Sequence, residues 1–385
     1  MGKMANITDP RNPVYAKGVP RPPVLMALTS VRFFAAMHVA LYHLVRPFSL
    51  WGPLTPVIST GYVGVSFFFF LSGFILTYSH AAEYQLGKGQ PIKFWIARFA
   101  RIYPVYLLSM LFAAYTGFRY FRQPIHIIAY LADLLMIQSW SVRIVSFFHV
   151  TAWSLSVEMF FYLVFPFLLL RLHPSTRVKA YLPVFLFWLL AMLPPLLCVL
   201  YYPASSWVEG AGGAIQVFRV HRLPLLALPE FLAGVSLGWV HLRFPPSPKI
   251  GQYLAIIGMI AFTTGLFLSD HLPNVMIHNG LFIPFYSLII LGLSQRHWLS
   301  NLLSASWLVL LGEASYALYL FHFLFNDWTK DSFGAGNGLA SALWKVAILI
   351  PVSIALHLSI ERPGRRLILQ WWSRRQSANR TAPLC

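Results

Sequence analysis

An arginine and a histidine share an apolar segment near the start of the chain. Arg32 and His43 are eleven residues apart within the run 24–45. At 100° per residue their side chains would share one helical face, about 16 Å apart along the axis. Arginine keeps its charge, so Arg32 would need a polar or water-filled interior. Histidine can act as a general base, so the pair indicates a functional site, with helix packing as the alternative.

A second apolar segment, 150–171, carries a serine and a glutamate at helical spacing. Ser154 and Glu158 are four residues apart and would share one helical face, and Trp153 directly precedes Ser154. Apolar residues follow Glu158, and a buried carboxylate stays charged only when it is paired. A histidine partner would keep Glu158 charged and would orient the imidazole for acid–base chemistry. The alternative is a structural pair between Glu158 and an arginine.

A third apolar segment, 305–326, carries Tyr319 and His322 at helical spacing. With Trp153 and Ser154, these side chains could form the polar wall of a substrate cavity. They could equally be the aromatic and polar side chains that are common at membrane interfaces.

We expect a basic cytoplasmic loop, 83–103, before the apolar segment that begins at Pro104. Arg98 and Arg101 are three residues apart on one helical face, and Lys93 lies just before them. Arginine pairs suit bidentate binding of phosphate. The alternative is a basic belt that contacts anionic lipid beside the membrane.

The composition excludes an ordinary water-soluble enzyme and a disordered chain. Of the 385 residues 58% are hydrophobic and only 10% are charged, whereas soluble domains carry about 25% charged residues. The formal net charge of +18 resides mostly between apolar runs, where Lys and Arg set membrane topology, so we do not expect a nucleic-acid partner. The two cysteines and the scattered histidines show neither a disulfide framework nor a metal-binding spacing.

These patterns predict an all-α membrane helix bundle with both termini in the cytoplasm. A bilayer core of about 30 Å needs roughly 20 helical residues. The candidate spans are 24–45, 61–80, 104–121, 150–171, 181–201, 222–243, 250–269, 278–294, 305–326 and 340–360. The positive-inside rule favours these ten spans and makes the broken apolar segment 125–140 re-entrant or interfacial. We expect a cytoplasmic tail at 1–23, the bundle at 24–360 with a helix end at Glu361-Arg362-Pro363, and a basic cytoplasmic tail at 361–385.

Six motifs together resemble the integral-membrane acyltransferase 3 family. The resemblance covers roughly residues 25–365, and its motifs follow the order of the family. The matching stretches are Arg32 through His43, Gly61 through Phe74, Arg98 through Pro104, Trp153 through Glu158, Ser315 through His322, and Glu361-Arg362-Pro363.

The resemblance implies an O-acyltransferase that moves an acyl group, often acetyl, from cytoplasmic acyl-coenzyme A to a hydroxyl. Implied acceptors are cell-surface glycans, glycolipids and secreted metabolites, and the implied home is a bacterial inner membrane. His43 corresponds to the catalytic histidine of the family, with Arg32 as its partner and Glu158 as the acidic residue of the third motif. Arg98 and Arg101 correspond to coenzyme A contacts, with Lys93 beside them. We expect no metal and no hydrolase-like domain outside the membrane.

Two other classes of function stay open. Intramembrane Arg, His and Glu residues could belong to a proton-coupled transporter of a sugar or lipid-linked intermediate, although the sequence shows no inverted repeat. A membrane scaffold or sensor without chemistry is the third possibility.

Overall fold

The computed structural model describes residues 22–45, 48–116, 123–145, 147–201, 222–333 and 338–381. Every regular element within these ranges is a helix. The long helices are α1 (Met26–Leu44), α3 (Val63–Gln85), α4 (Pro91–Thr116), α6 (Trp153–Leu168), α7 (Arg177–Tyr201), α10 (Pro224–Arg243), α11 (Pro248–Phe267), α13 (Ile283–Leu293), α15 (Ser306–Phe333), α16 (Leu339–Leu356) and α17 (Arg362–Thr381). The short ones are η1 (Phe48–Leu54), α2 (Thr55–Ser59), α5 (Pro124–Leu134), η3 (Gln138–Trp140), η4 (Leu170–Leu172), η5 (Ser269–His271), α12 (Asn274–His278), α14 (Trp298–Leu303) and η6 (His357–Glu361).

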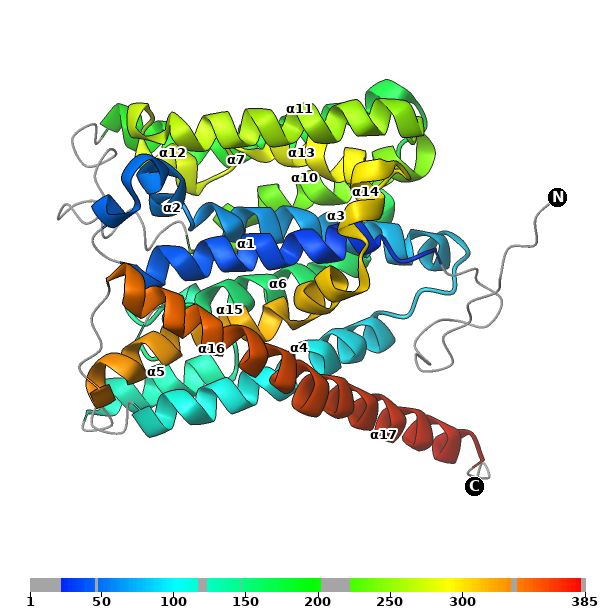
Figure 1. The fold of residues 1–385 in the computed structure, drawn as a ribbon. Coiled ribbons are helices and arrows are strands. Elements are labelled where there is room, and N and C mark those ends of the chain that lie inside the picture. The colour runs from blue at the N-terminus through cyan, green and yellow to red at the C-terminus, as the bar shows by residue number, and fades with distance from the viewer. Residues whose placement is uncertain are drawn as a thin grey trace.

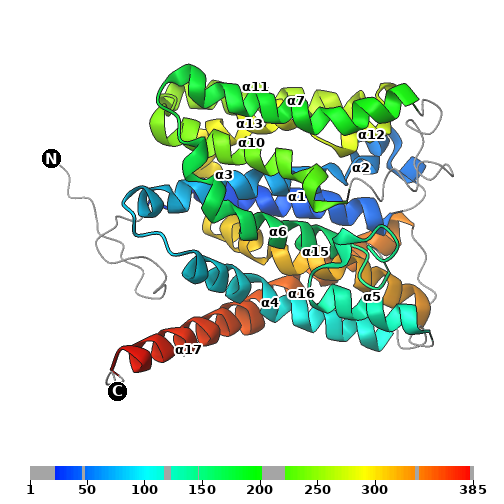
Figure 2. The ribbon, with the colours of Figure 1, turned by 180° about the vertical axis from the view of Figure 1, so that it is seen from behind.

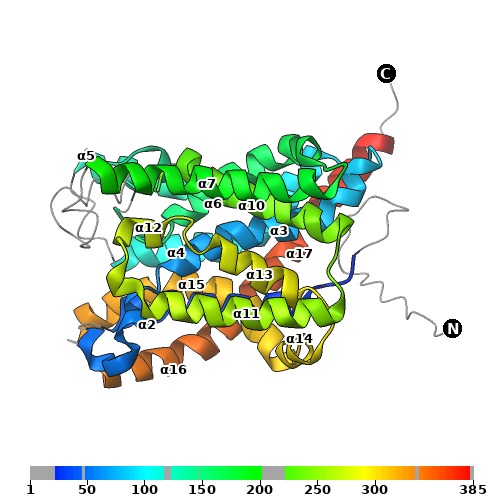
Figure 3. The same ribbon diagram turned by 90° about the horizontal axis from the view of Figure 1, so that it is seen from above.

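The long helices run side by side, as a membrane bundle requires (Figure 1). Helices α7, α11 and α13 lie on one side and α4, α5 and α16 on the other, with α1, α3, α6, α10 and α15 between them (Figures 1 and 2). Seen from above, α7 and α11 flank α10 and α13 (Figure 3). Two clusters of buried apolar side chains fill the bundle, and α1, α3 and α10 contribute to both.

The predicted all-α membrane bundle is confirmed. Among the described residues, eight helical segments are long and apolar enough to cross a bilayer. The other two expected spans are α1 and α6, which lie inside the bundle and carry five of the ten predicted site residues. Helix α5, in the broken segment 125–140, has 11 residues. Its length of about 16 Å is too short to span a bilayer.

The local sequence explains where several helices begin and end. Helices α4, α10 and α11 begin at Pro91, Pro224 and Pro248, because a first-turn residue needs no amide hydrogen and proline already has a helical φ. Helix α3 is followed by Gly87, whose φ of 65° allows the left-handed turn that closes many helices.

Two predicted boundaries were wrong. The basic stretch before Pro104 is not a loop, because α4 runs unbroken from Pro91 through Pro104. No helix ends at Glu361-Arg362-Pro363, because the π-helical turn η6 finishes at Glu361 and α17 continues from Arg362 to Thr381. Pro363 follows this turn after Arg362, so the irregular π-helical pattern lies where proline removes an amide hydrogen from the helix. Residues 1–21 of the expected N-terminal tail lie outside the described residues.

One end of the bundle collects basic segments, and we call it the basic end. Helix α1 begins there, α4 begins there, and α17 projects beyond it (Figure 1). The positive-inside rule assigns this end to the cytoplasm, which stays a prediction.

Reciprocal glycine contacts set how closely α3 and α10 approach. A Cβ on Gly234 would lie 1.9 Å from the Phe70 carbonyl oxygen, and one on Gly73 would lie 2.1 Å from the Phe231 carbonyl oxygen. Both distances are far below van der Waals contact, so the two backbones touch only because neither residue has a side chain. The acyltransferase-like motif around Gly73 therefore holds α3 against α10.

We expect Gly234→Ala to lower the thermal stability of the protein in detergent. Added bulk in a packed core costs about 1–3 kcal/mol, and here the obstacle is backbone that cannot rotate away. Gly338→Ala is the matched control, because a Cβ at Gly338 meets nothing within 4 Å. Equal melting temperatures for the two variants would contradict this account of the contact.

Candidate functional site

A central cavity of about 150 Å³ brings together six of the ten predicted site residues. It lies among α1, α3, α4, α6 and α15. The predicted residues that line it are Arg32, Arg98, Arg101, Ser154, Glu158 and Tyr319. Three arginines and one carboxylate therefore line the same cavity, and this excess of positive charge favours binding of an anionic ligand.

Glu158 is held within this cavity by hydroxyl groups. Its Oε1 accepts a hydrogen bond from Ser72 Oγ at 3.2 Å and another from the Tyr162 hydroxyl. Arg32 lines the same cavity. No histidine of the described residues contacts Glu158, so the predicted pair with an imidazole is not formed there. Within the described part of the chain, Glu158 forms no ion pair with an arginine either, and its partners are the hydroxyl groups of Ser72 and Tyr162.

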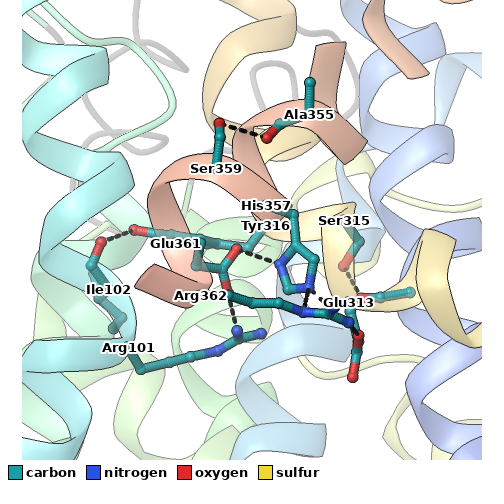
Figure 4. A network of polar contacts seen from close by, with 11 residues as sticks. Arg101, Ile102, Glu313, Ser315, Tyr316, Ala355, His357, Ser359, Glu361 and Arg362 are labelled. Carbon is teal, nitrogen blue, oxygen red and sulfur yellow. Dashed lines mark hydrogen bonds and ion pairs between the residues drawn. The ribbon is translucent and has the colours of Figure 1, made fainter. Parts of the chain in front are cut away.

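The two arginines of α4 have different surroundings. The guanidinium of Arg98 lies 5.7 Å from the centre of the Phe94 ring, and its buried Nε has no hydrogen-bond partner among the described residues. Arg101 forms an ion pair with Glu361 of η6, whose side chain is fully buried (Figure 4). Lys93 lies nearer the start of α4 and does not line the cavity described here.

A chain of polar groups leads from the cavity to His43. The Tyr319 hydroxyl is 2.7 Å from Ser154 Oγ and donates to the Thr151 carbonyl oxygen at 3.1 Å. One turn along α15, His322 Nδ1 lies 2.7 Å from the Tyr319 carbonyl oxygen. The rings of His322 and His43 are 5.3 Å apart between centroids. His43 thus lies beyond the cavity wall, toward the end of α1 that is opposite the basic end.

The contact with Tyr319 determines which nitrogen of His322 carries a proton. A carbonyl oxygen only accepts hydrogen bonds, so Nδ1 must be the donor. In the neutral ring Nε2 is then an acceptor. This atom is buried and has no hydrogen-bond partner within the described part of the chain. His322 therefore presents an unused basic nitrogen in the neighbourhood of His43.

Trp153, the tenth predicted residue, begins α6. Its ring lies edge-on to Phe69 and 5.3 Å from the guanidinium carbon of Arg222. It packs beside Ser154 but does not line the cavity.

A model of the acyltransferase domain of the acyltransferase 3 family matches residues 27–362, which is most of the chain. The chain belongs to the acyltransferase 3 family. It is therefore a membrane O-acyltransferase, and the matched region contains every predicted site residue.

Curated relatives agree with this membership. The chain is 28% identical to acyltransferase MdmB of Streptomyces mycarofaciens over 91% of this chain and 94% of that protein. It is 28% identical to O-acetyltransferase OatA of Staphylococcus aureus over 78% of this chain and 50% of that protein. The match thus spans about half the length of OatA. No solved structure matches the chain.

The structure also shows four residues of this acyltransferase that sequence reasoning missed. Ser72 and Tyr162 hold Glu158, and Tyr162 could have been found because it follows Glu158 by one helical turn. Glu361 belongs to one of the six family motifs, but the sequence did not reveal its contact with Arg101 because the two residues are far apart along the chain.

His149, in the loop before α6, is the fourth. It is fully buried beside Tyr106, its Nδ1 lies 3.3 Å from Thr151 Oγ1, and its Nε2 has no partner among the described residues. Burial, reinforced by the nearby His322, lowers the pKa of His149 to about 3. His149 is therefore neutral at physiological pH. No sequence pattern distinguished it from the other histidines.

Among the described residues, no group of three His, Cys, Asp or Glu side chains could hold a metal ion.

Proposed function

We propose that this acyltransferase moves an acyl group, in the simplest case acetyl, from acyl-coenzyme A to a hydroxyl of a cell-surface glycan, glycolipid or secreted metabolite. The observation that carries the proposal is the cavity lined by three arginines, whose wall leads through Tyr319 and His322 to His43. The names of the relatives, an acyltransferase and an O-acetyltransferase, support the reaction class.

In this proposal the donor and the acceptor approach from opposite ends of the bundle. The phosphates of the donor bind Arg98 and Arg101 toward the basic end, which would be cytoplasmic. The pantetheine arm passes Arg32, and the thioester lies between the cavity and His43. The acceptor hydroxyl reaches His43 from the far side of a bacterial plasma (inner) membrane.

The proposed chemistry needs only an imidazole and a thioester. His43 takes the proton of the acceptor hydroxyl as the oxygen attacks the thioester carbonyl carbon. The new C–O bond forms, the C–S bond breaks, and the leaving thiolate takes the proton back from His43. A transient acyl-histidine would divide the same transfer into two steps. Arg32, near Glu158 in the cavity, would stabilise negative charge on the donor.

The decisive experiment incubates the full-length protein, in membranes, with acetyl-coenzyme A labelled in the acetyl group. We expect label to move to a glycan, glycolipid or small metabolite, together with release of free coenzyme A. Mass spectrometry with and without the gene would then identify the acceptor from a lost acyl increment. An intact thioester with a transported sugar or lipid-linked compound would contradict the proposal and favour the transporter.

We expect His322→Asn to lower kcat by about tenfold or more while the protein still folds. The asparagine amide can replace the Nδ1–H that donates to Tyr319, but it has no basic nitrogen at the position of Nε2. The decrease in kcat follows if His322 Nε2 shares the proton that His43 takes from the acceptor hydroxyl. Turnover at the wild-type rate would show that His322 serves only as the donor to Tyr319.

A further inference from the structure

The π-helical turn between α16 and α17 holds a buried carboxylate against the cavity arginine Arg101. Glu361 is fully buried, pairs with Arg101 on one side and lies 2.9 Å from His357 Nδ1 on the other (Figure 4). The side chain of His357 is only 2% exposed. Since a buried carboxylate is costly without partners, both contacts are needed to keep Glu361 in place.

A second layer of contacts fixes His357 in turn. Its Nε2 accepts a hydrogen bond from Arg362 Nε at 2.9 Å, and Arg362 also pairs with Glu313 of α15. His357 Nε2 also lies 3.4 Å from Glu313 Oε2, so the ring stands between two carboxylates, and Nδ1 is the nitrogen that donates to Glu361. Contacts on both sides of the ring therefore fix its orientation toward Glu361.

The π-helical geometry makes this double contact possible. His357 reaches Glu361, four residues on, and Arg362, five residues on, at the same time. Residues five apart align along a π-helix, and π-helical turns are frequent at functional sites. The π-helical turn thus does not only end a membrane span but also places His357 in contact with both Glu361 and Arg362.

The network also joins three helices of the basic half of the bundle. Arg101 comes from α4, Glu313 from α15, and the remaining members from η6 and the start of α17 (Figure 4). Arg362 and Glu313 are partly exposed, with 42% and 38% of their side chains accessible, whereas Glu361 is not accessible at all. The chain of contacts runs from the protein surface to the wall of the cavity.

We propose that Glu361, His357, Arg362 and Glu313 form a positioning cluster that aims Arg101 at a phosphate of the acyl donor. The inference rests on the proposed function, because it assumes a phosphate-bearing donor in the cavity. These residues act through Arg101 and do not touch the donor themselves. Among the residues that the structure describes, no carboxylate forms an ion pair with Arg98, which lies over the Phe94 ring and would contact the donor without a positioning cluster of its own.

Charge alone predicts the opposite effect of removing Glu361. Replacing its carboxylate with an amide makes the region more positive, so simple electrostatics predicts tighter binding of an anionic donor. Positioning predicts weaker binding, because a freed guanidinium loses its orientation toward the phosphate. The direction of the change therefore discriminates between the two accounts.

The test compares Glu361→Gln with the wild-type protein, both full length and in detergent or membranes. We expect the donor KM to rise at least about tenfold, with a smaller change in kcat. In the Arg101→Ala background, Glu361→Gln should have no further effect on the donor KM, because the residue it positions is gone. Glu230→Gln is the matched control, since Glu230 is a buried acid of α10 outside the cluster.

His357→Gln provides a second variant if Glu361→Gln does not fold. It leaves the Arg101–Glu361 pair but removes the imidazole that supports it, so we expect a smaller rise of the donor KM. A donor KM that is unchanged or lower in either folded variant would overturn the proposal. So would additive effects of Arg101→Ala and Glu361→Gln.

Coenzyme A binding separates this inference from the proposed function. Equilibrium dialysis with labelled coenzyme A needs no acceptor and no turnover. Weaker binding to Glu361→Gln than to wild type would support the cluster even if no acyl transfer were found. Equal binding, or no binding to the wild type, would overturn it.

Discussion

Replacing His43 with alanine is expected to abolish acyl transfer while the protein still inserts and folds. His43 is the imidazole that the proposed mechanism uses as general base, and such bases contribute about 10²–10⁴-fold to rate. Its ring is only half-buried and packs against His322 and Phe323, so the truncation removes little core. Transfer of labelled acetyl groups in membranes, normalised to the amount of protein, measures the loss.

A surface histidine supplies the control for this experiment. His271 is exposed in η5, and His271→Ala should leave transfer unchanged. His43→Gln should be as inactive as His43→Ala, because glutamine keeps the polarity but cannot accept a proton near neutral pH. Acylation that persists in membranes containing only the His43 variants would remove this residue from the mechanism.

The double replacement of Arg98 and Arg101 with alanine is expected to raise the donor KM strongly. Hydrogen bonds to charged groups contribute about 1.5–3 kcal/mol each, so losing two should weaken donor binding by about 10²-fold or more. Both guanidinium groups line the central cavity, which distinguishes them from a basic belt on the membrane surface. Initial rates at varied acetyl-coenzyme A, with the acceptor saturating, measure the change.

Two arginines outside the cavity test whether position matters more than charge. Arg374→Ala with Arg375→Ala removes the same charge from α17, where both side chains are exposed. We expect this control to leave the donor KM unchanged. An unchanged KM in the Arg98 and Arg101 variant would instead favour a lipid-binding role for the pair.

The amino-acid sequence by itself determined the helical architecture and pointed to most of the residues that line the cavity. Apolar runs of bilayer length form helices, because a helix satisfies all of its backbone hydrogen-bonding groups within one segment in lipid. Ionisable residues within such runs cost enough free energy to indicate a functional role. The eleven-residue spacing of Arg32 and His43 and the four-residue spacing of Ser154 and Glu158 are local, so helical periodicity alone predicts their shared faces.

Only the tertiary structure decided which of these faces meet. Glu158 was expected near an imidazole, but packing places it in the cavity with the arginines and next to Ser72 of α3. Arg101 and Glu361 are far apart in sequence, and no periodicity connects them. Their contact exists because α4 runs through Pro104 and a π-helical turn continues α16 into α17.

The physical reason is that periodicity is a property of one helix, whereas a cavity is a property of several. Backbone contacts such as Gly234 against Phe70 set how helices approach, and α3, which makes this contact, also contributes side chains such as Ser72 to the cavity. The candidate site residues were therefore visible in the chain, and the partners that hold them were not.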